Sequence, residues 1–265
     1  MALEHGRFGL DEYVQHVIDF LEVIGPGAHV LAVCQPCVPT LAATAVMAED
    51  GHAATPRSLT LMAGPVDARI NPTGVNELAT SKPITWFERN FIATVPPRHR
   101  GALRRVYPGF VQVAAFLSMD PGRHMAALRG LYEDVLAGNE ARAAVTRRFY
   151  REYFAVLDLA ADFYLETVRA VFQEHALARG RLEWRGRRVD PCAITRTALL
   201  TVEGENDQIC AVGQTAAVHG LCAGVKPFRR RQHLQPGVGH FGVFSGRRWK
   251  LEVYPAVRSF VLAAD

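Results

Sequence analysis

The hydrophobic pattern of the N-terminal part of the chain predicts a helix, a buried strand and a second helix. Apolar residues recur at three- and four-residue steps over residues 8–24, the spacing of an amphipathic helix. Residues 28–34 are a short, continuously apolar run with β-branched members, which is typical of a strand buried on both faces of a parallel sheet. Small and apolar residues return at helical period over residues 36–47, with Pro36 in the tolerant first turn. Cys34 therefore lies at a predicted strand-to-helix junction.

The remainder of the chain alternates between strand-like and helix-like segments, apart from one long helical stretch. Over residues 65–185 the pattern is helical, rich in aromatic residues and broken by Pro and Gly, with no convincing strand. The other predicted elements, in chain order, are a strand over 57–63, a strand over 195–207, a helix over 211–221, a strand over 226–235 and a C-terminal helix over 249–264 that is interrupted near Pro255. This alternation predicts an α/β fold with a parallel sheet.

Composition limits the class of protein without identifying it. The chain has 265 residues, of which 49% are hydrophobic and 21% charged, ordinary values for a globular protein with a substantial core. No apolar run approaches the length of a membrane span, and the N-terminus lacks the pattern of a secretory signal. We therefore expect a cytoplasmic protein with no membrane-spanning segment.

Charge and cysteine content argue against a nucleic-acid partner, a disulfide framework and a zinc site. The net charge of +4 comes from scattered arginine clusters with little aromatic interleaving, so we expect no nucleic-acid partner. An odd number of cysteines without a secretory signal argues against a disulfide framework. A structural zinc site needs a second close pair of ligands, whereas the cysteines beyond the first two are widely spaced (Cys34, Cys37, Cys192, Cys210 and Cys222). We expect neither a metal nor an organic cofactor.

Three predicted strand ends carry residues with complementary chemistry: Cys34, Asp207 and His240. Reactive groups gather at the carboxyl ends of strands in open parallel sheets. A thiolate can attack an acyl carbon, an imidazole can take and return the proton, and a carboxylate can hold the imidazole in one tautomer. The chain order of nucleophile, acid and histidine is that of the α/β-hydrolase fold. This order predicts a cysteine-type catalytic triad.

The residues leave alternatives open at each of these positions. Cys34 and Cys37 bracket Gln-Pro at a helix start, as in a thioredoxin-like redox pair, although that reading gives Asp207 and His240 no role. Cys37 is otherwise a packing residue. Rivals to Asp207 are the nearby Glu203 and Glu205, whereas the other late histidines, His219 and His233, have the positions of ordinary surface or core residues.

Four runs of sequence resemble the intracellular polyhydroxyalkanoate depolymerases: "GRFGLDEYVQHVIDFLEVIGPGAHVLAVCQP", "LMAGPVDARINPTGVNELA", "LLTVEGENDQICAVGQT" and "GVGHFGVFSGRRW". The resemblance implies an α/β-hydrolase with a helical cap that cuts ester bonds of poly(3-hydroxybutyrate). It also implies Cys34 in "VCQP" as nucleophile, Asp207 in "GENDQI" as acid and His240 in "GVGHFGVFSG" as base. The polymer or its oligomers, and the surface of polymer granules, are the partners that this resemblance implies.

The sequence departs from the resembled family before Cys34, where one helix and one strand stand in place of several strands. We therefore expect an N-terminally truncated member whose sheet lacks its first strands and whose nucleophile strand has an unpaired edge, a surface on which a second copy could pair. The backbone N–H of Gln35 is the expected oxyanion donor, and the second donor of a full hydrolase is expected to be absent. The predicted hydrolase core is residues 1–64 and 186–265, and the predicted cap is residues 65–185.

The predicted reaction is ester hydrolysis through an acyl-enzyme on Cys34. Two other functions stay open: a polyhydroxyalkanoate synthase-like acyltransferase, which uses the same three residue types, and a catalytically impaired homologue that binds granules. The sequence does not distinguish polymer from oligomer as the substrate.

Overall fold

The computed structural model describes residues 3–265, which divide into two compact units. The larger unit contains residues 8–84 and 165–265, and the smaller contains residues 3–7 and 85–164. Among the described residues, no helix is both long and apolar enough to cross a membrane.

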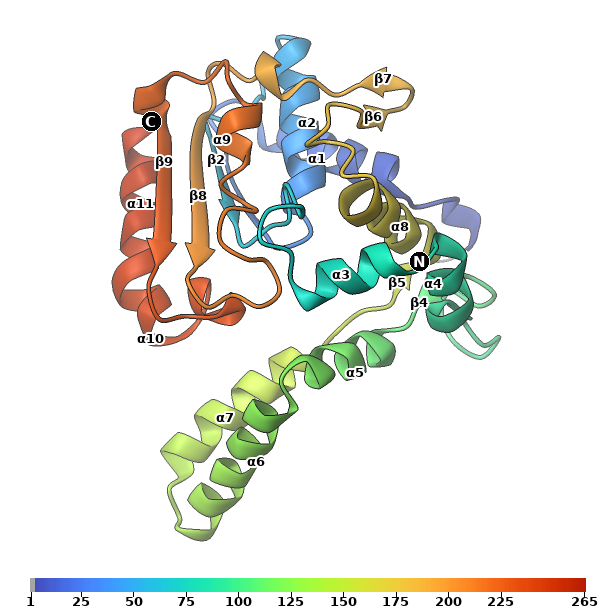
Figure 1. The fold of residues 1–265 in the computed structure, drawn as a ribbon, viewed down its shortest axis with the longest axis vertical. Coiled ribbons are helices and arrows are strands. Elements are labelled where there is room, and N and C mark those ends of the chain that lie inside the picture. The colour runs from blue at the N-terminus through green and yellow to red at the C-terminus, as the bar shows by residue number, and fades with distance from the viewer. Residues whose placement is uncertain (1–2) are drawn as a thin grey trace. The chain divides into compact units, whose positions relative to one another are not determined.

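The larger unit is built on a four-stranded parallel sheet (Figure 1). The strand order is β1-β2-β8-β9, and their bounds are β1 His29–Val33, β2 Ser58–Met62, β8 Ala198–Gly204 and β9 Arg230–Gln235. Every residue of β2 and β8 is buried, as expected for central strands covered on both faces. Among the described residues β1 pairs with β2 alone, so the predicted open edge at the nucleophile strand is confirmed.

Helices cover both faces of this sheet. The helices of the larger unit are α1 Leu10–Ile24, α2 Cys37–Glu49, α3 Gly74–Ser81, α9 Val218–Leu221, α10 Gly246–Arg248 and α11 Tyr254–Ala263, and α8 Ala161–Thr167 contains one boundary between the units. Single-turn 3₁₀ segments (Pro191–Ala193, Pro227–Arg229 and His240–Val243) and π-helical segments (Val168–Gln173 and Trp249–Val253) join them. The second π-helical segment, Trp249–Val253, ends just before Pro255, because a proline has no N–H for the hydrogen bonds of a helix.

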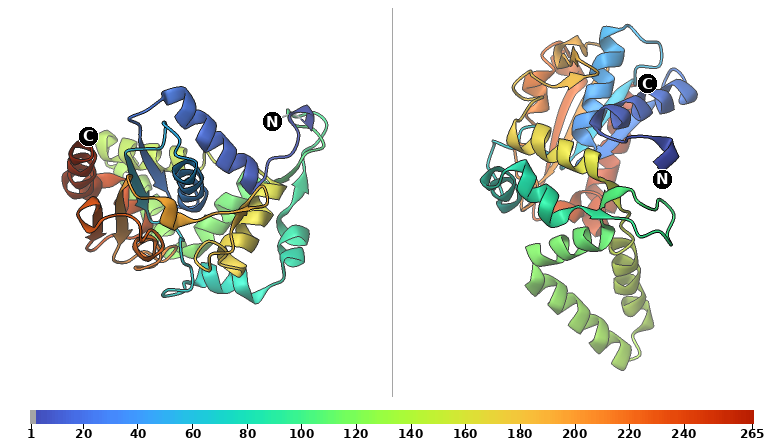
Figure 2. Two further views of the ribbon diagram at one scale, coloured as in Figure 1. Left: turned by 90° about the horizontal axis from the view of Figure 1, so that it is seen from above. Right: turned by 90° about the vertical axis from the view of Figure 1, so that its right-hand side faces the viewer.

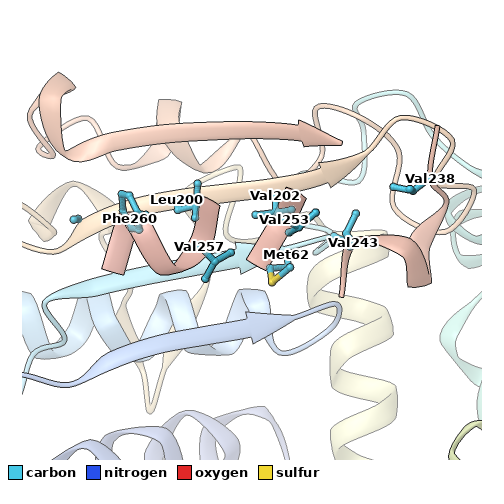
Figure 3. Close-up of a cluster of buried hydrophobic side chains, with 10 residues drawn as sticks. Met62, Leu200, Val202, Val238, Val243, Val253, Val257 and Phe260 are labelled. Carbon is cyan, nitrogen blue, oxygen red and sulfur yellow. The ribbon is translucent and has the colours of Figure 1, made fainter. Parts of the chain in front are cut away.

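One face of the sheet packs against the C-terminal helix (Figure 3). Met62, Leu200 and Val202 project from the strands onto Val257 and Phe260 of α11. The cluster is apolar throughout, and burial of each large side chain contributes on the order of 1.5–3 kcal/mol. This packing ties the last helix to the two strands that form the centre of the sheet.

The other face packs against α2, which is buried on nearly every side. All residues from Cys37 to Met47 are buried, and a helix that is apolar all round has to lie within a core. α1 covers the outer side of α2 through Leu10, Val14, Ile18 and Leu21, its buried stripe. The helix that follows Cys34 is therefore held between the sheet and another helix.

The smaller unit combines a small antiparallel sheet with long helices. Its strands are β3 Ala93–Thr94, β4 Arg105–Tyr107 and β5 Leu159–Ala160, and its helices are α4 Ile84–Phe91, α5 Gly109–Met119, α6 Pro121–Leu136 and α7 Glu140–Tyr153, after a 3₁₀ turn at Leu3–His5. α6 and α7 run side by side as a hairpin, the green segment of Figure 2.

Two sequence predictions are wrong in this part of the chain. The 65–185 segment does contain strands: the three short ones of the smaller unit and β6 Glu183–Trp184, which pairs with β7 Arg187–Arg188 just beyond the segment. These two- and three-residue strands are too short to leave a period in the sequence. The predicted helix over 211–221 is reduced to the single turn of α9, because the backbone N–H groups of Gly213, Thr215 and Ala216 donate to a buried carboxylate instead.

The compact units also divide the chain at different places from the predicted core and cap. Residues 65–84 and 165–185 belong to the unit that contains the sheet. α3 is held to the loop after β8 by hydrogen bonds from Gln214 to Asn76 and from Thr73 to the Ile209 carbonyl. In the 165–185 range, Gln173 Nε2 donates to the carbonyls of Ala79 and Lys82, each at 2.9 Å, which joins this segment to α3.

Candidate active site

The candidate nucleophile lies where β1 turns into α2. The Cys34 N–H continues the sheet ladder to the Met62 carbonyl at 2.8 Å, and the Cys37 N–H returns to the Cys34 carbonyl at 3.0 Å, which closes a tight turn. Cys34 itself has φ 65°, in the left-handed region that a residue with a Cβ rarely adopts. Backbone strain of this kind is maintained only where the surroundings enforce it, and it is a feature of the strand-to-helix turn that presents a nucleophile.

Asp207 and His240 form a buried pair beyond the ends of β8 and β9. His240 Nδ1 lies 2.8 Å from Asp207 Oδ2, and the Asp207 side chain is fully buried. The second oxygen, Oδ1, accepts hydrogen bonds from the N–H groups of Ile209 at 2.8 Å and Cys210 at 2.9 Å. These bonds orient the carboxylate, which in turn fixes His240 Nδ1 as the nitrogen that pairs with Asp207.

Cys34 lies close enough to His240 to influence the ionisation of its imidazole. Burial by itself would lower the pKa of His240, but the interactions with Asp207 and with Cys34 outweigh it and raise the pKa to about 10. A histidine with this pKa is protonated at neutral pH. The structure thus brings together all three residues that the sequence predicted, Cys34, Asp207 and His240.

The Glu203 and Glu205 alternatives occupy other positions. Glu205 accepts a hydrogen bond from the Gly237 N–H at 2.8 Å, on the turn before His240. Glu203 is fully buried, and its Oε1 accepts from the N–H groups of Gly213, Thr215 and Ala216 at 2.9–3.0 Å. It anchors the loop after Asp207. This role could not be predicted from the sequence, where 211–216 has the pattern of a helix.

Gly64 and Thr215 join this loop to the nucleophile turn, and sequence analysis missed both. The Gly64 N–H donates to Thr215 Oγ1, and that hydroxyl donates to the Gly64 carbonyl, each at 2.9 Å. A Cβ on Gly64 would lie 2.2 Å from Cys37 Sγ and 2.9 Å from the Cys34 carbonyl oxygen. Only glycine allows the chain after β2 to pass this close to the turn. The "AGP" after the second strand is a signal of a turn but not of this contact.

Cys37 is a packing residue in this structure. It is fully buried, and its Sγ lies 3.3 Å from the Ala32 carbonyl and 3.7 Å from that of Met62. Burial raises the pKa of its thiol, and the nearby Cys34 raises it further. A neutral, buried thiol is a poor partner for redox exchange, so the geometry favours the unequal roles of the two cysteines over a redox pair.

Gln35 follows Cys34 directly, at the start of the turn. Its N–H forms no backbone hydrogen bond with the part of the chain that the structure describes, and it remains available at the base of the turn. The other two late histidines are engaged elsewhere: His219 Nε2 lies 3.0 Å from Thr201 Oγ1, and His233 Nε2 lies 2.9 Å from Gln235 Oε1.

The parallel sheet, the strained turn after β1 and the carboxylate and histidine after later strands define the α/β-hydrolase class. Solved structures of that class share the fold. A monoacylglycerol lipase from Paleococcus ferrophilus is 10% identical, with a TM-score of 0.53 over 98% of this chain and 77% of its own. The Mycobacterium tuberculosis protein Rv0554 is 13% identical, with a TM-score of 0.51 over 97% of this chain and 74% of its own. No curated protein sequence matches this chain.

The sequence narrows the class to one family. The family model described as "PHB de-polymerase C-terminus" matches residues 63–265, and the chain belongs to this family. Asp207 and His240 lie within the matched range, and Cys34 precedes it. Membership makes the protein a carboxylic ester hydrolase of the α/β-hydrolase class.

Proposed function

We propose that this protein hydrolyses ester bonds of poly(3-hydroxybutyrate) or its oligomers, with Cys34 as nucleophile, His240 as acid and base, and Asp207 as the group that orients His240. The observation that carries the proposal is the buried 2.8 Å contact of His240 Nδ1 with Asp207, because the same imidazole is close enough to Cys34 for the two side chains to interact. The family of the chain supports this substrate.

In the acylation step, the Cys34 thiolate attacks the ester carbonyl carbon and forms a C–S bond. The negative charge that develops on the carbonyl oxygen is stabilised by the Gln35 N–H. Collapse of this intermediate breaks the C–O bond, and the protonated His240 gives its proton to the leaving alkoxide. The products of the step are a 3-hydroxyacyl thioester on Cys34 and a shortened chain that ends in a hydroxyl group.

In the deacylation step, the now neutral His240 takes a proton from water while the water oxygen attacks the thioester carbonyl. The C–S bond breaks, Cys34 leaves as a thiolate and the free carboxylic acid is released. Asp207 holds the imidazole in one orientation through both steps and stabilises its charged form. The thiolate and the imidazolium are thus restored together.

The experiment is an assay of wild-type protein and Cys34→Ala on amorphous poly(3-hydroxybutyrate) particles and on short 3-hydroxybutyrate oligomers. The rate of acid release should fall by at least roughly 10³-fold in Cys34→Ala, because the loss of one member of a catalytic triad removes most of the rate enhancement that the triad provides. Cys192→Ala is the matched control, since Cys192 is exposed and lies elsewhere, and it should keep wild-type activity.

The same assay distinguishes the other two functions. Polymer elongation from 3-hydroxybutyryl-CoA without ester hydrolysis would assign the triad to acyl transfer instead. Equal inactivity of wild type and Cys34→Ala on every substrate, with both proteins folded, would contradict the catalytic proposal and leave a non-catalytic, granule-binding role.

A further inference from the structure

Helix α6 carries an apolar stripe that nothing in its own unit covers. None of its sixteen residues is buried. The stripe consists of Met125, Leu128, Tyr132, Val135 and Leu136, whose exposed fractions lie between 42% and 69%. At 100° per residue these positions share roughly 100° of the helix circumference. An apolar stripe of this width normally packs against a neighbouring element.

The stripe is separate from the surface that α6 presents to α7. His124 of α6 contacts the α7 ring of Tyr150, with Nδ1 3.0 Å from the Tyr150 hydroxyl, and its ring lies against that of Tyr153. Ala127, Leu131 and Asp134 continue this half-buried face along the helix. The contact with α7 is therefore already made by other residues, and the stripe is a second apolar face.

The spacing of four of the five stripe residues is symmetric. Met125 and Val135 stand five residues on either side of Gly130, and Leu128 and Tyr132 stand two residues on either side of it. When two copies of α6 cross antiparallel at the level of Gly130, Met125 meets Val135 of the second copy and Leu128 meets its Tyr132. A two-fold interface requires a surface that is complementary to itself in this way.

The charges beside the stripe are centred one residue away from this level, on residue 131. Arg129 and Glu133 flank one border, where they form an exposed ion pair at 3.4 Å within the helix. In the antiparallel pair, Arg129 lies within two residues of the level of Glu133 of the second copy, about 3 Å along the helix axis. Each copy thus offers a cation where the other offers a carboxylate.

We propose that this stripe is the interface of a homodimer in which two α6 helices pack antiparallel. The charge pattern favours a second copy over the surface of an uncharged polyester. Such a surface could pack against the apolar stripe, but it has no charges to pair with Arg129 and Glu133. The five side chains of the stripe would bury on the order of 450 Å² per copy, at the low end for a specific interface, so the dimer is weak and concentration-dependent. The proposal does not depend on the catalytic one.

The experiment is sedimentation equilibrium of the full chain from low micromolar to submillimolar concentration. Wild type should pass from monomer to dimer within this range. Leu128→Glu places a charge in the centre of the stripe and should weaken the dimer on the order of 100-fold. Val145→Glu is the matched control, because Val145 is an exposed apolar residue on α7, outside the stripe, and it should dimerise as wild type does.

A charge exchange tests the orientation of the two helices. Arg129→Glu and Glu133→Arg should each weaken the dimer roughly tenfold, because each variant opposes like charges across the interface. The double variant restores opposite charges and should return to within about threefold of wild type. Circular dichroism of all variants would show that α6 remains helical.

Three results would overturn the proposal. The first is a monomer at every concentration. The second is a dimer that survives Leu128→Glu but is lost in Leu31→Lys, which would place the interface at the open edge of β1, where Leu31 is exposed. The third is a monomer whose binding to poly(3-hydroxybutyrate) particles is lost in Leu128→Glu and kept in Val145→Glu, which would assign the stripe to the polymer.

Discussion

Strand β8 and helix α6 are opposites in burial although both are rich in apolar residues. All seven residues of β8 are buried, whereas α6 has no buried residue among sixteen. The strand is surrounded by β2, β9 and the C-terminal helix, so its side chains are held in place by packing against these neighbours. The comparison shows that Asp207 follows a strand whose side chains are all packed, while the apolar residues of α6 are left exposed within their own unit.

The same chemical change should have very different effects in the two elements. Leu200→Ala in β8 should lower the free energy of unfolding by about 2–5 kcal/mol, because it leaves a cavity in a packed core. Leu128→Ala in α6 should change it by less than about 0.5 kcal/mol, measured at a concentration where the chain is monomeric. Urea unfolding of both variants tests this, and equal losses would contradict the comparison.

Glu203 should be the most sensitive polar residue of the site region. Glu203→Ala leaves the N–H groups of Gly213, Thr215 and Ala216 buried without their acceptor, and the expected loss is about 3 kcal/mol or more of unfolding free energy. Glu203→Gln keeps one acceptor oxygen and should recover most of that loss. Thermal unfolding of the two variants is the measurement. If Gln is as damaging as Ala, the three hydrogen bonds are not the reason that Glu203 matters.

Gly64 should tolerate no side chain. Gly64→Ala introduces a Cβ against Cys37 and the Cys34 carbonyl, and relief of that overlap should cost about 1–3 kcal/mol of stability. Because the overlap acts on the turn that holds Cys34, kcat should fall more than the apparent affinity for substrate. Gly74→Ala is the matched control, since its Cβ would meet open space at the start of α3. Equal behaviour of the two variants would contradict the close approach.

The buried Asp207–His240 pair predicts a pH dependence of stability. The pKa of His240 is raised from 6.5 to about 10, so the stabilisation is fully present below pH 6.5 and is lost as pH rises toward 10. Wild type should therefore lose stability between pH 7 and 10 more steeply than Asp207→Asn, by at most about 1.4 kcal/mol per pH unit for one proton. Urea midpoints across this range test the sign. Parallel curves for the two proteins would mean that the pair does not favour the charged imidazole.

The parts of the fold that the sequence predicts are those with a period or a continuous apolar run. The mainly apolar residues of β2 and β8 are buried because both sheet faces are covered, and α1 shows the three- and four-residue spacing of a helix with one buried stripe. The apolar run of β1 predicted the strand correctly, but the prediction that it is buried on both faces is wrong: Ala32 is its one buried residue and Leu31 is exposed, because β1 is the edge strand. The short strands of the smaller unit and the loop anchored by Glu203 depend on contacts between distant residues. Such contacts leave no local pattern.

The candidate site also has parts that the sequence predicts and parts that it does not. Cys34, Asp207 and His240 could be predicted because strand ends of a parallel sheet meet at one edge and because the residue order is that of the hydrolase fold. Their catalytic roles stay a prediction. The contact of Gly64 with Thr215 could not be predicted, because a hydroxyl and a glycine 151 positions apart carry no pairing signal.

The most direct test of the account is to locate the acyl group during turnover. Wild-type protein would be mixed with a 3-hydroxybutyrate trimer, quenched in acid within the first turnover and digested for mass spectrometry. The account predicts one 3-hydroxybutyryl group on the peptide that contains Cys34, removable by hydroxylamine as a thioester, and none in Cys34→Ala. Hydrolysis of the trimer with no adduct in wild type, or with undiminished rate in Cys34→Ala, would contradict a nucleophilic Cys34.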